Sequence, residues 1–150
     1  MPASSEAASL QPVNDEHYLR QDGEFENGQS KKKCKIRTMD AFCREQRIEA
    51  LDFIKCDTEG AEKMVFSGAD GVLREFRPIV YTEMLRKHAK RFGYHPNELI
   101  ELFKGYGYSC YREEGRRLIP FEIMDEETVE TNFFFLHREN HGKLVERYVI

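Results

Sequence analysis

The sequence predicts an α/β domain built on a mixed sheet, with parallel strands in its middle part and antiparallel strands at its C-terminal end. Two observations support this fold class. Two short apolar runs between residues 51 and 84 are separated by a segment of helical character, which is the arrangement of a strand–helix–strand crossover. The apolar runs after residue 105 lie too close together for another crossover, so antiparallel pairing is expected there.

The first expected elements are a helix over residues 39–46 and a strand over 51–57. Thr38 and Asp40 offer capping side chains at the start of a helix-compatible stretch. The strand is mostly apolar and meets a polar turn, so we expect it to end near Asp57.

Helical character returns over 61–67 and in a further turn over 71–76. Pro78 then introduces an apolar run whose β-branched and aromatic residues favour a strand over 78–84. Because helix connects the two strands, we expect 51–57 and 78–84 to be parallel neighbours whose carboxyl ends share one edge of the sheet.

The C-terminal part begins with a longer helix. Pro96 suits its first turn, and Gly105 follows its last apolar residue. Strands are expected over 106–112 and 117–121, on either side of a hairpin turn, and over 132–137.

Composition restricts the class of protein. The chain has 150 residues, of which 40% are hydrophobic, and this suffices for one core. Its net charge of −4 disfavours nucleic acid and anionic lipid as partners. The longest strongly apolar run, at 133–136, is too short to cross a membrane, and the N-terminus lacks the pattern of a secretory signal. A cytoplasmic protein without nucleic-acid or membrane partners is therefore expected.

Residues 1–35 differ in composition from the rest of the chain. Pro, Ser, Gly, Asn and Gln stand among scattered charges, so we expect a flexible or loosely docked arm followed by one domain over 36–150. The lysine run at 31–33 fits a solvated linker better than a nucleic-acid patch. The four cysteines form no C-x-x-C pair and are interpreted as reduced thiols.

The densest polar feature is the stretch D-T-E-G-A-E at 57–62, and Glu83 ends the next expected strand. Ligands of open α/β sheets bind beyond the carboxyl ends of parallel strands, so these acids can face a substrate, a cofactor or a cation. They can instead serve the helix that follows, with Asp57 or Thr58 as its cap and the glutamates near its positively polarised N-terminus.

The order of these motifs resembles the FkbM family of methyltransferases. The most specific part is the strand ending in D-x-E-G-A-E at 57–62, followed by G-A at 68–69 and by P-I-V-x-x-E at 78–83. Residues from about 36 to 138 carry this resemblance, which is to the C-terminal half of the family's domain.

This resemblance implies a Rossmann-like class I methyltransferase fold, here partial. It also implies transfer of a methyl group from S-adenosylmethionine, usually to a hydroxyl oxygen of a small molecule or sugar. Carried over to these positions, it implies catalytic roles for Asp57, Glu59 and Glu83 and cofactor contacts by Asp57, Thr58 and Gly60, with no bound metal.

One part of the family pattern has no counterpart in this sequence. No early strand leads into a G-x-G-type turn that would cradle the cofactor, and residues 1–35 show no strand followed by a ribose-binding acid. Gly105 and Gly107 follow a helix and precede a strand, which is the reverse of the required order. Whether this chain alone is active is therefore not decided by its sequence.

Two alternatives remain beside the enzyme. The first is a non-catalytic α/β interaction module, or a fragment completed by a partner chain or a second copy that covers a bare sheet edge. The second is a divalent cation site, since clustered carboxylate oxygens suit hard cations; its ligands would be Asp57, Glu59, Glu62 and Glu83. The histidines lie in no zinc-hydrolase motif, so surface or packing roles are expected for them.

Overall fold

The computed structural model describes residues 36–150, and the arm expected over 1–35 lies outside the described residues. Every helix and strand expected after residue 35 is present, and two further short helices, α4 (Arg86–Arg91) and α6 (Gly142–Tyr148), were not expected. In chain order the elements are α1 (Met39–Glu45), β1 (Phe53–Cys56), α2 (Glu62–Ser67), α3 (Asp70–Glu75), β2 (Ile79–Glu83), α4 (Arg86–Arg91), α5 (Pro96–Gly105), β3 (Tyr108–Glu114), β4 (Arg117–Pro120), β5 (Asn132–His137) and α6 (Gly142–Tyr148).

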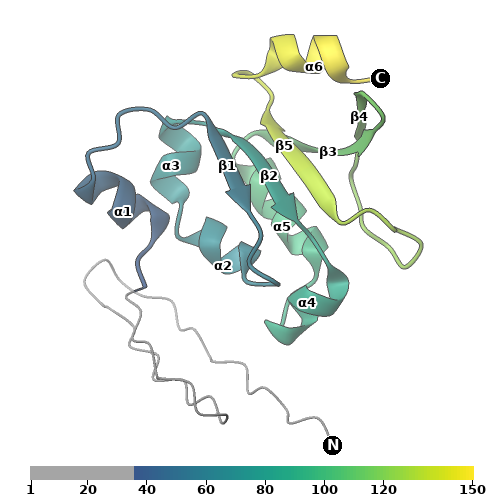
Figure 1. The fold of residues 1–150 in the computed structure, drawn as a ribbon, viewed down its shortest axis with the longest axis horizontal. Helices are drawn as coiled ribbons and strands as arrows, with labels where there is room; N and C mark the ends of the chain where they lie inside the picture. The colour runs from purple at the N-terminus through teal and green to yellow at the C-terminus, as the bar shows by residue number, and fades with distance from the viewer. Residues whose placement is uncertain (1–35) are drawn as a thin grey trace, which may run out of the picture.

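The strands form one mixed sheet in the order β1-β2-β5-β3-β4 (Figure 1). β1 and β2 are parallel, with Cys56 opposite Thr82, and the connection between them contains α2 and α3. All the other neighbours pair antiparallel. The mixed sheet and the parallel pair at 51–57 and 78–84 are thus confirmed, although β1 is shorter than expected at both ends.

The core lies between the sheet and a helical layer, and Figure 1 shows α5 running behind the strands. Phe103 of α5 stacks on Phe135 of β5 with ring centroids 4.1 Å apart, and Phe66 of α2 meets the Phe103 ring edge-on with centroids 4.8 Å apart. All three rings are fully buried. Burying a side chain of this size contributes about 1.5–3 kcal/mol, so these contacts anchor both helices to the sheet.

α1 is joined to α3 by hydrogen bonds. Thr38 caps α1 as expected, its Oγ1 accepting from the Ala41 N–H at 3.1 Å. The carboxylate of Asp40 instead accepts from the N–H groups of Gly71 and Val72, at 2.9 Å each. It therefore satisfies the first turn of α3, a helix distant in sequence.

Two histidines, His137 and His141, accept backbone hydrogen bonds at the C-terminal end of β5. His141 Nδ1 accepts from the His137 N–H at 2.9 Å, and His137 Nδ1 accepts from the Asn140 N–H at 3.2 Å. Both rings must be neutral at Nδ1 to accept these bonds. Burial, the main cause, lowers the pKa of both imidazoles.

The outer edge of the sheet, the cysteines and the helix lengths can each be compared with what the sequence predicts. Within residues 36–150 the outer edge of β1 pairs with no strand, and Phe53 on it is 49% exposed. The described cysteines, Cys43, Cys56 and Cys110, are free and buried, as expected for reduced thiols. None of the helices in this part of the chain has the length and apolar character needed to span a membrane.

Candidate functional site

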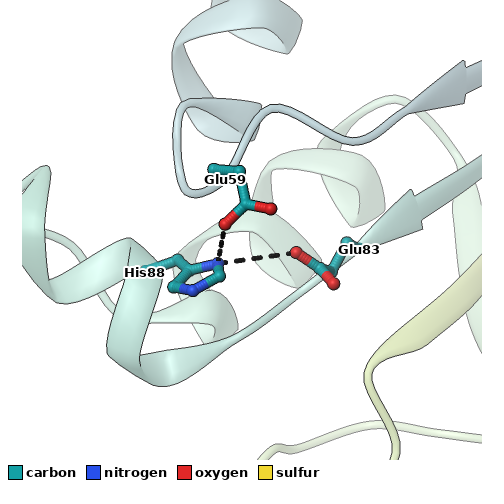
Figure 2. Close-up of side chains that lie close together, drawn as sticks. All are labelled: Glu59, Glu83 and His88. Carbon is teal, nitrogen blue, oxygen red and sulfur yellow. Dashed lines mark ion pairs between the residues drawn. The ribbon is translucent and has the colours of Figure 1, made fainter.

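Two glutamates and a histidine meet beyond the carboxyl ends of the parallel strands (Figure 2). Glu59 lies on the loop after β1, Glu83 is the last residue of β2, and His88 belongs to α4. Because β1 and β2 are parallel neighbours in register, their ends deliver both carboxylates to the same edge of the sheet. We call these three residues the edge cluster.

The imidazole of His88 lies between the two carboxylates. Its Nδ1 is 3.0 Å from Glu59 Oε2 and 3.5 Å from Glu83 Oε2. The Nδ1 atom is closed off from solvent, yet it makes no hydrogen bond with the described residues. The side chain of Glu83 is 19% exposed and that of Glu59 is 70% exposed, so the edge cluster opens to solvent on the side of Glu59.

Glu62, the last acid of the D-x-E-G-A-E motif, points into the protein instead. It is 2% exposed, and its Oε1 accepts from the N–H and the hydroxyl of Thr58, at 2.8 and 3.0 Å, and from the Gly60 N–H at 3.3 Å. The Tyr94 hydroxyl donates to Oε2 at 3.4 Å. Glu62 therefore folds the loop after β1 and does not join the edge cluster.

The loop also holds Glu59 in an uncommon backbone conformation. Its φ is +55°, in the left-handed region that costs a residue with a side chain about 1–3 kcal/mol. Gly60 follows at φ +112°, and a Cβ there would lie 2.5 Å from the carbonyl oxygen of His88. The Arg91 guanidinium donates to the Glu59 carbonyl at 3.1 Å. These contacts press the loop against α4 and set the Glu59 carboxylate beside His88.

The other predicted site residues lie around the edge cluster. Asp57 pairs with Lys55 at 3.4 Å at the surface and is not part of it. Thr58 and Gly60 shape the loop through their bonds to Glu62. Neither Asp57 nor Thr58 caps α2, whose N-cap is Ala61 without a side-chain hydrogen bond. The expected cap by Asp57 or Thr58 was therefore wrong, whereas Glu62 does lie in the first turn of α2, as that interpretation expected.

Charge accumulates at this edge. Partial burial, followed by the negative charges of Asp57 and Glu59, raises the pKa of Glu83 above its usual range, and His88 opposes this shift. Burial, with smaller contributions from neighbouring acids, raises the pKa of Cys56 to about 11. The Cys56 thiol therefore stays protonated near neutral pH and is not a nucleophile.

His88 was missed by sequence reasoning, which expected a surface or packing role. α4 is six residues long and only Ala89 among them is buried, so no apolar stripe predicts this helix. The signal that could have found His88 is its place on the connection that leaves the strand ending in Glu83.

The chain matches the model of the methyltransferase FkbM domain over residues 2–110, well over half of its length. The matched span contains the loop after β1, the end of β2 and the whole edge cluster. The match also begins before residue 36. The expectation that the chain resembles only the C-terminal half of that domain therefore stays a prediction. No curated protein and no solved structure matches the chain.

Proposed function

This chain belongs to the FkbM methyltransferase family, and from that premise we propose that it transfers a methyl group from S-adenosylmethionine to a hydroxyl oxygen of a small molecule or sugar. The observation that carries the proposal is the convergence of Glu59 and Glu83 at the edge where two parallel strands end. That edge is where ligands of open α/β sheets bind. A Rossmann-like class I fold is part of the same proposal.

The chemistry of this edge fits the proposed methyl donor. S-adenosylmethionine has a positive sulfonium, an amino group and ribose hydroxyls, and when bound it supplies an electrophilic methyl carbon. The exposed carboxylate of Asp57 can accept hydrogen bonds from such groups. The N–H groups of Thr58 and Gly60 already donate to Glu62, so these residues would contact the donor through carbonyl oxygens or packing.

The edge cluster is the proposed place of the acceptor hydroxyl. Glu59 and Glu83 offer oxygens that can accept its hydrogen bond, and they bring it to a fixed position beyond the strand ends. As the acceptor oxygen forms its bond to the methyl carbon, the bond from that carbon to sulfur would break and S-adenosylhomocysteine would leave, while the hydroxyl proton would pass to a carboxylate of this edge. Positioned proton acceptors contribute typically about 10²–10⁴-fold in rate.

A methyl-transfer assay tests this function. The full chain, at millimolar S-adenosylmethionine and with a panel of sugars and small alcohols, should form S-adenosylhomocysteine. Asp57→Asn, Glu59→Gln and Glu83→Gln should each lower the rate, by up to about 10²–10⁴-fold for a group that takes part in proton removal. Glu139→Gln is the control, because Glu139 is 79% exposed and pairs with Arg77 away from this edge.

The alternative function is a non-catalytic interaction module. The unpaired outer edge of β1 within the described residues favours it, since such edges accept a strand from another chain. Product formation at the rate of a protein-free control, with wild type and the three variants alike, would contradict methyl transfer and leave this alternative.

A further inference from the structure

We propose that the edge cluster is a binding site for a divalent cation of the first transition-metal row. The cation would be held by one carboxylate oxygen each from Glu59 and Glu83 and by Nδ1 of His88. Carboxylate oxygens suit Mg²⁺ and Mn²⁺, whereas imidazole nitrogen suits the later metals of the row. Two oxygens and one nitrogen together fit Mn²⁺, Fe²⁺ or Zn²⁺ better than Mg²⁺ or Ca²⁺, whose ligands are oxygens.

The spacing of the three ligand atoms fits one ion. Metal–ligand bonds of about 2.0–2.2 Å place neighbouring ligand atoms about 2.8–3.6 Å apart in octahedral or tetrahedral coordination. The Nδ1 atom of His88 lies 3.0 Å from the Glu59 oxygen and 3.5 Å from the Glu83 oxygen. All three ligand atoms lie within 4.8 Å of one another, so a small adjustment of the exposed Glu59 side chain completes the set.

The unsatisfied nitrogen of His88 is the second observation that points to a ligand. Nδ1 is buried and faces two carboxylates, but it makes a directional hydrogen bond to neither. An imidazolium that served only as an ion-pair partner would direct its N–H at one carboxylate oxygen. A cation between the three atoms would accept the Nδ1 lone pair and offset the negative charge of both glutamates.

The surrounding structure holds two of the ligands in place. Glu83 ends an interior strand of the sheet, and the loop of Glu59 is fixed by Glu62 and by the Arg91 guanidinium. The site is open on the side of Glu59, as in catalytic metal sites, which keep coordination positions for water or substrate. The ligand set differs from the one considered from the sequence, since Glu62 and Asp57 are engaged elsewhere and His88 takes part.

A cation at this position has a consequence for the chemistry, and this step alone rests on the proposed function. A bound cation can take the acceptor oxygen as a further ligand and make its proton more acidic. Glu59 and Glu83 would then act as metal ligands, and the proton would pass to water or to Asp57. Cation binding itself requires neither a methyl donor nor an acceptor.

Mn²⁺ binding to the full chain tests the proposal, because Mn²⁺ is paramagnetic and has little affinity for the free thiols that would bind Zn²⁺. Titration followed by electron paramagnetic resonance should show one bound ion per chain. Electron spin echo envelope modulation should show a coupled ¹⁴N nucleus from His88. Glu59→Gln and Glu83→Gln should weaken binding by about 10-fold or more.

Two variants make the result specific. His88→Gln should remove the ¹⁴N modulation and weaken binding, and Glu139→Gln should leave both unchanged. Circular dichroism confirms that each variant is folded. The proposal is overturned by absence of binding at millimolar Mn²⁺, and equally by binding that lacks ¹⁴N modulation or that Glu59→Gln and His88→Gln leave intact. These outcomes are independent of the methyl-transfer assay.

Discussion

Two glutamates three positions apart in one motif have opposite roles. Glu62 is buried and satisfies the backbone of the loop after β1, whereas Glu59 is mostly exposed and turns toward His88. The loop conformation explains the difference, because the left-handed backbone at Glu59 reverses the chain between the two side chains. Glu62 thus stabilises the loop after β1, and Glu59 is the acid that this loop places in the edge cluster.

We expect these two residues to separate folding from function. Glu62→Ala leaves the N–H groups of Thr58 and Gly60 unpaired, so the free energy of unfolding should fall by about 2–4 kcal/mol. Glu59→Gln should change it by about 0.5 kcal/mol or less, as surface substitutions do. Urea denaturation measures both. Equal losses in the two variants would show that Glu59 is a structural residue.

The histidines at the end of β5 predict a pH dependence of stability. The folded protein favours neutral His137 and His141, so their pKa values are lowered from the ordinary value of 6.5. The unfolded chain then binds more protons below about pH 6.5, and the stability that these rings contribute above this pH is lost as the pH falls.

His141→Asn tests this assignment. The asparagine side chain can still accept from the His137 N–H but does not titrate. Urea midpoints measured from pH 8 to pH 5 should therefore fall less steeply for the variant than for the wild type. Parallel curves would mean that His141 does not contribute to the acid sensitivity.

At the scale of elements, the edge cluster depends on the contact between the loop after β1 and α4. Gly60 lies against the backbone of His88, and Arg91 bonds back to the loop. α4 is short and only Ala89 of it is buried, so its own packing contributes little to its position. The loop and α4 therefore hold each other.

Gly60→Ala should disrupt this contact. Its Cβ would meet the His88 carbonyl oxygen at 2.5 Å while the backbone keeps a positive φ, so both steric and conformational costs arise. Gly93→Ala is the matched control, since Gly93 also has positive φ, at +75°, but a Cβ there meets no atom within 4 Å. In thermal melts Gly93→Ala should lose only the conformational part, about 1 kcal/mol, and Gly60→Ala clearly more. Equal shifts would contradict the close contact.

The elements show what the sequence could predict and what it could not. Strand β5 was predicted with its observed bounds because it is a continuous run of apolar side chains between polar residues. The edge acids Glu59 and Glu83 were predicted because strand ends in a parallel sheet determine their place. α4 and its His88 escaped, because a short polar helix has no periodic signal and tertiary contacts alone position it. The inward turn of Glu62 depends on a backbone conformation that composition does not reveal.

At the scale of the whole molecule, two features of residues 36–150 stand together. The strand ends that carry Glu59 and Glu83 lie within the family match, and the outer edge of β1 pairs with no strand of this part of the chain. Within residues 36–150 the parallel part of the sheet ends at β1, whose outer edge carries the exposed Phe53. From the sequence we expect neither a glycine turn nor a ribose-binding acid of the family's kind, and this stays a prediction, since the family match begins at residue 2. The carboxylates of the edge are then expected to lie in a chain without most of the groups that bind the cofactor.

This arrangement predicts weak binding of S-adenosylmethionine by the 150-residue chain. Calorimetry should give a dissociation constant well above about 1 μM, the value that corresponds to about −8 kcal/mol. The Glu139→Gln variant should bind equally weakly. A micromolar constant would show that this chain holds the cofactor by other groups and that the expectation of a partial domain is wrong.

The central place of β5 has a consequence for the way the protein is made. β5 is the last strand in the sequence, yet it separates β2 from β3 in the sheet. During synthesis, at about 5–20 residues per second, β2 leaves the ribosome some seconds before the strand that joins it to β3, and the β3–β4 hairpin leaves about one second before that strand. For that interval both present unpaired edges beside apolar surface, which is the state most exposed to aggregation and to chaperones. The sheet closes only after translation has passed residue 137, so the nascent chain cannot complete its core gradually.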